Sequence, residues 1–287
     1  MDFSEPNAVQ QVVMTQIETQ TLTVNTQEWF YRQAIPRNET TDLPIVFLHG
    51  LLAHSYCWRI LLEDIAEAGL TAYAPDWLGE GSSGKPSQQD FSYQPSAFIT
   101  ALEAFLAELN LSRFHLVVQG FVGSVGLQYA FRHPEQIERL VILNTPLGSS
   151  VRLPWLMRRW GIPLMGEMLT QDPLLVDRTL ETGSGYVISD ENLGIYRKPF
   201  LQNSQAGRSL VATIKNLNLS QAMVEIENSW QNWEKPTQII WGMDDPWLSA
   251  DVPSAIAQAN KNVRFSKLEE AKHYPRSEEH TSELQSL

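Results

Sequence analysis

The sequence predicts an α/β fold, with a mostly parallel central sheet, helices on both faces and a helical cap. Three observations predict it. Short apolar segments alternate with helical segments along most of the chain, two polar-apolar alternating segments precede them, and a long helical stretch interrupts the alternation. Strands joined by helices run parallel, so this order gives a sheet wrapped by helices.

The first expected element is an antiparallel hairpin. Ile17–Val24 and Glu28–Gln33 alternate apolar and polar residues, and the turn formers Asn25 and Thr26 lie between them. After a polar loop, Ile45–Leu48 is a continuous apolar run, which is typical of a strand buried on both faces.

Helices and strands are then expected to alternate. Segments with helical periodicity are separated by short β-branched or apolar runs, and the same pattern resumes near the C-terminus. The expected helices are Trp58–Ala68, Pro95–Leu109, Phe121–Arg132 and Ser249–Ala259, and the expected strands are Thr71–Ala74, Phe114–Val118, Leu140–Leu143, Thr237–Trp241 and Val263–Lys267.

The stretch 148–225 is expected to form the helical cap. It is rich in Trp and Met, is broken by several prolines and glycines, and is too long for a plain connection. The core is therefore expected in two parts, residues 1–147 and 226–275. Residues 276–287 resemble the in-frame translation of a common sequencing adapter and are excluded from fold prediction.

Composition excludes several classes of function. A formal net charge of -12 without a run of Lys or Arg argues against nucleic acids and anionic membranes as partners. The N-terminal segment has no basic region, and no apolar run is long enough to span a membrane. Cys57 is the only cysteine, so no disulfide can form within the chain. We expect a cytoplasmic protein with a small-molecule ligand and no metal or organic cofactor, and nothing in the sequence indicates an oligomeric state.

Gly120 stands where the surrounding sequence indicates a catalytic nucleophile. The apolar strand Phe114–Val118 leads through a turn with Gly120 and Gly123 into the helix Phe121–Arg132. A strand, sharp turn and helix of this kind is a nucleophile elbow, whose apex side chain points at the substrate. Glycine at the apex supplies no such side chain.

Five ordered motifs resemble the α/β-hydrolase superfamily, and within it the capped branch of haloalkane dehalogenases and epoxide hydrolases. The resemblance covers about residues 17 to 275. The motifs are His49–Arg59, Asp76–Pro86, the elbow, Trp241–Pro246 and Ala271–Pro275. The resemblance also implies a closing C-terminal helix, which is expected to be missing after Pro275.

The resemblance assigns candidate site residues by position. The family order is nucleophile, acid, then histidine, so Asp245 is expected to be the acid and His273 the base, beside Gly120. Asp244 is expected to be a solvated turn residue. The backbone N–H groups of Leu51 and Phe121 are the expected oxyanion donors. The expected substrate-binding residues are His49, Gly50, His54 and Trp155.

The departures from the family pattern leave three interpretations open. The first is a hydrolase of a small apolar molecule in which His273, oriented by Asp245, acts without a side-chain nucleophile. The second is a non-catalytic pseudohydrolase that binds a small ligand or a protein partner. The third is a sequence error at Gly120, although its neighbours also depart from the pattern.

Two further expectations concern chemistry that we consider disfavoured. In the family, dehalogenases hold the departing halide between an Asn and a Trp, and the matching positions are Leu51 and Phe121. Dehalogenation is therefore not expected. Ser124 lies one helical turn beyond the apex, so its hydroxyl is expected to point away from the site.

Overall fold

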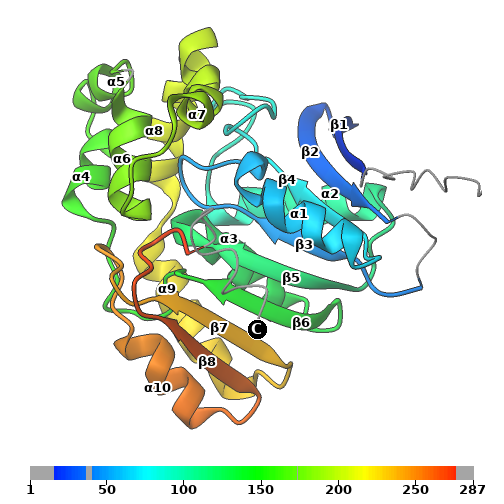
Figure 1. Ribbon diagram of the computed structural model, residues 1–287. Helices are drawn as coiled ribbons and strands as arrows, with labels where there is room; N and C mark the ends of the chain where they lie inside the picture. The colour runs from blue at the N-terminus through cyan, green and yellow to red at the C-terminus, as the bar shows by residue number, and fades with distance from the viewer. Residues whose placement is uncertain (1–15, 37–40, 173, 276–287) are drawn as a thin grey trace, which may run out of the picture.

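An eight-stranded mixed sheet forms the centre of the molecule (Figure 1). The computed structural model describes residues 16–36, 41–172 and 174–275. The strand order is β1-β2-β4-β3-β5-β6-β7-β8. The strands are β1 (Gln16–Val24), β2 (Gln27–Ile35), β3 (Ile45–Leu48), β4 (Ala72–Pro75), β5 (Phe114–Gln119), β6 (Ile137–Leu143), β7 (Thr237–Gly242) and β8 (Val263–Leu268).

The expected hairpin is confirmed at one edge of the sheet. β1 pairs antiparallel with β2, and Asn25 and Thr26 adopt left-handed φ values of 48° and 68° at the turn. Two left-handed residues give the turn a twist that matches the flanking strands. β2 also runs antiparallel to β4, and the strands from β4 to β8 are parallel.

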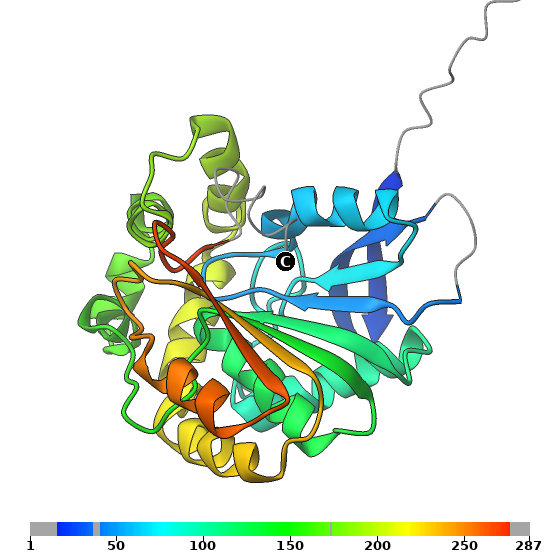
Figure 2. The ribbon, with the colours of Figure 1, turned by 60° about the horizontal axis from the view of Figure 1, so that its bottom comes forward.

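Helices cover both faces of the sheet, as the alternation predicts (Figures 1 and 2). One face packs against Leu62 and Ala66 of α1, and the other against buried residues of α2, α3 and α9. Arg132 of α3 and Glu225 of α9 form an ion pair at 2.7 Å. The core helices are α1 (Arg59–Glu67), which follows the short turn η1 (Ser55–Trp58), α2 (Pro95–Glu108), α3 (Gly120–Arg132), α9 (Leu219–Ser229), with η3 (Trp230–Asn232) after it, and α10 (Asp251–Ala259).

A group of cap helices lies at the carboxyl ends of the parallel strands (Figure 1). The expected end of the cap at residue 225 falls inside α9, which packs on α3 of the core, so we place the end of the cap before α9. The cap comprises α4 (Trp155–Arg158), η2 (Arg159–Gly161), α5 (Met165–Leu169), α6 (Leu174–Ser184), α7 (Asp190–Gln202) and α8 (Ser204–Asn216).

Two further expectations concern a membrane-spanning segment and the C-terminal tail. Within the described residues, no helix is both long enough and apolar enough to cross a membrane. The tail 276–287, and with it the expectation of a missing closing helix, lies outside the described residues.

Candidate active site

The side chains of Asp245 and His273 meet at the carboxyl ends of β7 and β8. His273 Nδ1 lies 2.7 Å from Asp245 Oδ2, and the side chains are 2% and 0% exposed. The other oxygen of Asp245 accepts from the backbone N–H groups of Trp247 at 2.8 Å and Leu248 at 3.1 Å. A carboxylate can only accept, so Nδ1 of His273 carries the hydrogen and Nε2 presents its lone pair when the ring is neutral.

Gly120 keeps the backbone conformation of an elbow apex. It is the first residue of α3, and its φ is +72°, in the left-handed region that favours glycine. A Cβ built on Gly120 would lie 3.4 Å from His273 Nε2 and 2.9 Å from the Cα of Gly50. Nε2 of His273 therefore faces the side-chain position of residue 120, and the backbone of Gly50 closes one side of that position.

Aromatic rings hold the imidazole of His273. Phe121 stacks on it with ring centroids 5.5 Å apart and an interplanar angle of 24°. Trp247 and Tyr274 present their rings nearly edge-on, at 4.7 Å and 5.0 Å. These contacts fix the orientation of the imidazole and exclude solvent from most of its surface.

Two polar residues that the sequence analysis missed complete the site. Asn144 follows β6 and donates from Nδ2 to Asp245 Oδ2 at 2.7 Å and to the carbonyl of Gly242 at 3.2 Å, while its Oδ1 accepts from the N–H of Gly242 at 2.8 Å. Gln119 donates from Nε2 to the carbonyl of His273 at 3.0 Å. Both residues are buried. Each directly follows an expected apolar strand, and a polar residue at that place was the signal available in the sequence.

The expected oxyanion donors flank the contact between Gly50 and Gly120. Leu51 follows Gly50 in the loop after β3, and Phe121 follows Gly120 in the first turn of α3. The N–H groups of a first helical turn have no carbonyl one turn earlier in the same helix. The N–H of Phe121 belongs to this first turn, and its ring stacks on His273; its role as an oxyanion donor stays a prediction.

The fold and these motifs agree with comparisons to known proteins. Residues 44–279 match the family model described as alpha/beta hydrolase fold. The chain belongs to this family.

Named relatives of this α/β-hydrolase include two classes of enzyme. A haloalkane dehalogenase of Mycolicibacterium paratuberculosis is 30% identical over 238 residues, which cover 78% of this chain and 77% of that protein. A cis-3-alkyl-4-alkyloxetan-2-one decarboxylase of Shewanella oneidensis is 30% identical over 233 residues, which cover 72% of this chain and 69% of that protein. The crystal structure of haloalkane dehalogenase DbeA from Bradyrhizobium elkani superposes with a TM-score of 0.78 at 24% identity, covering 91% of this chain and 92% of the other.

The ring of His49 is engaged inside the protein, and its expected role in substrate binding stays a prediction. Its Nε2 accepts from the N–H of Trp77 at 3.0 Å, so Nδ1 carries the hydrogen of the neutral ring and lies 2.9 Å from the carbonyl of Gly50. The ring is fully buried. Gly50 serves close packing: a Cβ there would lie 2.6 Å from Gln119 Oε1 and 3.1 Å from the Cα of Gly120.

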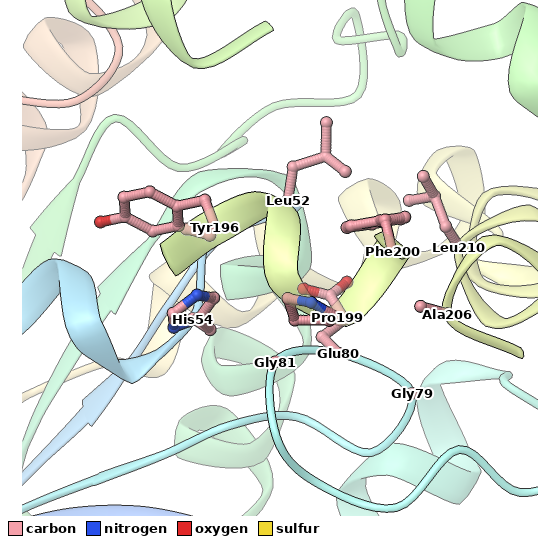
Figure 3. A pocket seen from close by; sticks show the side chains of 11 residues that line it. Leu52, His54, Gly79, Glu80, Gly81, Tyr196, Pro199, Phe200, Ala206 and Leu210 are labelled. Atoms are coloured by element: carbon pink, nitrogen blue, oxygen red, sulfur yellow. The ribbon is translucent and has the colours of Figure 1, made fainter. Parts of the chain in front are cut away.

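Of the other expected substrate-binding residues, the structure places His54 and not Trp155 in a buried wall. His54 lines a cavity between the core loops and cap helices α7 and α8 (Figure 3). Trp155 is 63% exposed, with the guanidinium of Arg158 over its ring at 5.4 Å. The side chain of Trp155 therefore projects into solvent, whereas Met157 and Trp160 in the same segment are buried.

The expectations for Ser124 and Asp244 agree with the geometry. Ser124 is buried and donates its hydroxyl to the carbonyl of Phe121 at 2.7 Å, back along its own helix. Asp244 is exposed, and its N–H donates to the carbonyl of Ala271.

The turn after β4 contains two buried carboxyl groups with different surroundings. Asp76 accepts from the N–H groups of Ser55 at 2.6 Å and Ser82 at 2.7 Å, so it holds this turn to the loop after β3. Glu80 in the same turn is buried, and neither of its carboxyl oxygens has a hydrogen-bond partner. Burial raises the pKa of Glu80 well above its usual value, and the nearby Asp76 raises it further.

Proposed function

We propose that this protein is a hydrolase of small, largely apolar molecules that activates water with the pair Asp245 and His273. The observation that carries the proposal is the 2.7 Å contact between the two side chains, with Nε2 of His273 3.4 Å from the position of a Cβ on Gly120. A base held at that point reaches a molecule placed where the family has its nucleophile.

The chemistry follows for an ester bond. His273 Nε2 takes a proton from water while the water oxygen bonds to the carbonyl carbon, and the N–H groups of Leu51 and Phe121 stabilise the oxyanion. The oxyanion then collapses and expels the alkoxide, which takes the proton back from the imidazolium. Asp245 orients the ring and stabilises its protonated form.

Two side chains argue against haloalkane turnover. Leu51 and Phe121 stand at the positions where the resemblance places the halide-holding Asn and Trp, and neither side chain has a polar hydrogen. Without an apex carboxylate there is also no group to displace the halide. We therefore expect no halide release from 1-bromobutane, measured beside the ester assays.

The test is turnover of a panel of small esters and lactones by matched variants. His273→Ala and Asp245→Asn should each lower kcat/KM by about 100-fold or more, the usual contribution of a general base and its orienting group. Asp244→Asn changes the neighbouring exposed carboxylate and should leave kcat/KM unaltered. Full turnover by His273→Ala would refute the proposal.

A second candidate function is binding without catalysis. The observation that favours it is the 2% exposure of His273 between the rings of Phe121 and Trp247, because the ring then has a packing role of its own. Calorimetric titration against a metabolite library, with turnover followed in parallel, separates the two functions. A ligand that binds and is never converted supports this candidate.

A further inference from the structure

A small cavity lies under the cap, next to the loops that follow β3 and β4, which carry His49 and Glu80. Its free volume is about 10 Å³, room for about one water molecule. Figure 3 shows the carboxyl group of Glu80 beside Pro199, with Phe200 and Leu52 above it. Its walls are mostly apolar and come from the loops after β3 and β4 and from α7 and α8: Leu52, Ala53, Tyr196, Pro199, Phe200, Ala206 and Leu210.

Among the described residues that line this cavity, Glu80 and His54 each carry buried polar atoms without a hydrogen-bond partner: both carboxyl oxygens of Glu80 and Nε2 of His54. Glu80 is 8% exposed. The nearest cationic candidate is His49, whose Nδ1 lies 3.6 Å from Glu80 Oε2. That ring is neutral when its Nε2 accepts from Trp77, and its Nδ1 hydrogen faces the Gly50 carbonyl at 2.9 Å. A buried carboxyl group left in this state favours a ligand that supplies the missing hydrogen bonds.

The surroundings of Glu80 favour a neutral ligand. Asp76 disfavours a negative charge on Glu80, whereas Lys85 favours one, and Lys85 also donates to the carbonyls of Gly81 and Ser83 at 2.8 Å and 2.7 Å. A ligand that brings a charge of its own would lose its hydration among the mostly apolar walls of the cavity, which a neutral ligand does not. A protonated carboxyl group both donates and accepts a hydrogen bond.

The cap wall of the cavity packs against His54 of the core. Pro199 has no N–H, so the carbonyl of Ile195, four residues earlier in α7, lacks its helical donor. That carbonyl faces His54 and favours its protonated form, although burial lowers the pKa of His54 overall. Tyr196 packs on the His54 ring at 4.8 Å. A ligand larger than water therefore requires α7, which lacks one helical hydrogen bond at Pro199, to move away from His54.

We propose that Glu80 is the recognition group of a ligand site under the cap, which takes the hydroxyl or carbonyl oxygen of a small, neutral, otherwise apolar molecule. This inference goes beyond the proposed function, because the residues that line the cavity include neither Gly120 nor Asp245 nor His273. Binding itself requires no turnover.

Calorimetric titration with three probes of equal chain length tests the charge preference. The probes are 2-hexanone, hexanoate and hexylammonium at pH 7, and the full chain should bind 2-hexanone at least tenfold more tightly than either ion. Glu80→Gln keeps a neutral donor and acceptor and should hold 2-hexanone within about threefold, whereas Glu80→Leu should lose at least tenfold, as expected when a hydrogen-bonding partner is removed. Glu63→Gln on the exposed face of α1 is the control and should change nothing.

A second variant keeps the proposal testable if Glu80→Leu does not fold. Ala206→Val adds two carbon atoms to the cavity wall on α8 without altering Glu80, and it should also weaken 2-hexanone binding at least tenfold. Unchanged binding in both folded variants, no binding by the parent protein, or tightest binding of hexylammonium with its loss in Glu80→Gln would each overturn the proposal. None of these outcomes bears on the Asp245–His273 turnover test, so the two proposals fail separately.

Discussion

Replacing Gly120 by alanine tests the backbone conformation on which the site is built. The φ of +72° is unfavourable for any residue with a Cβ, which costs about 1–2 kcal/mol. The added Cβ would also lie 2.9 Å from the Cα of Gly50, and relieving such a clash costs about 1–3 kcal/mol. The lower entropy of the unfolded chain returns about 0.4–1 kcal/mol. We therefore expect Gly120→Ala to lower the free energy of unfolding by about 1–5 kcal/mol.

Two other glycines separate the contributions of strain and contact. Gly69 has a φ of +81° and nothing within 4 Å of its built Cβ, so Gly69→Ala measures strain alone. Gly194 lies inside α7 without a left-handed φ and with nothing within 4 Å, so alanine there should stabilise the protein by about 0.4–1 kcal/mol. The expected order of stability is Gly194→Ala, then the parent, then Gly69→Ala, then Gly120→Ala.

Equilibrium unfolding in urea, followed by the fluorescence of the nine tryptophans, measures all three variants. If Gly120→Ala matches Gly194→Ala in stability, residue 120 is not at a strained apex against Gly50. The proposed geometry of the site would then be wrong.

Three further predictions concern buried and exposed polar groups. Asn144→Ala removes three buried hydrogen bonds around Asp245 and Gly242, and urea unfolding should show a loss of about 2–5 kcal/mol; a loss below that of an ordinary surface substitution would contradict the assigned bonds. The raised pKa of Glu80 means that the folded chain keeps a proton which the unfolded chain releases above about pH 4.5. The free energy of unfolding should therefore fall more steeply with rising pH in the parent than in Glu80→Gln. Equal slopes of the two proteins between pH 5 and 8 would show that Glu80 is ionised in the folded chain. Arg132→Met breaks a half-exposed ion pair with Glu225 and should cost no more than about 1 kcal/mol in the same unfolding assay, less still at 1 M salt.

The order of secondary structure could be predicted because its signal is local. Apolar periodicity and turn residues act within a few residues, so the hairpin, the alternating strands and helices and the elbow were all expected close to where the structure has them. Chain order in a known family also placed Asp245 and His273 at neighbouring strand ends, and the structure brings their side chains together.

The partners of these side chains could not be predicted from local patterns. Asn144 and Gln119 each contact a residue more than a hundred positions away in the chain, so their roles depend on the register of parallel strands. Trp155 shows the opposite error, because a large apolar residue in the cap can face solvent when its neighbours Met157 and Trp160 supply the packing. The hydrophobicity of a residue indicates that it tends to be buried, but it does not indicate which face of a short helix the residue occupies.

The sequence by itself determined the family, the order of strands and helices along the chain and the absence of a side chain at the elbow apex, because these depend on residue identity and local spacing. Tertiary structure alone decided that the ring of His49 is occupied, that Gly50 packs against Gly120, and that Glu80 is left with unsatisfied oxygens under the cap. The physical reason is that hydrogen-bond satisfaction is a property of everything that surrounds a polar group. The packing of the core loops against the cap decides which atoms surround each of these polar groups.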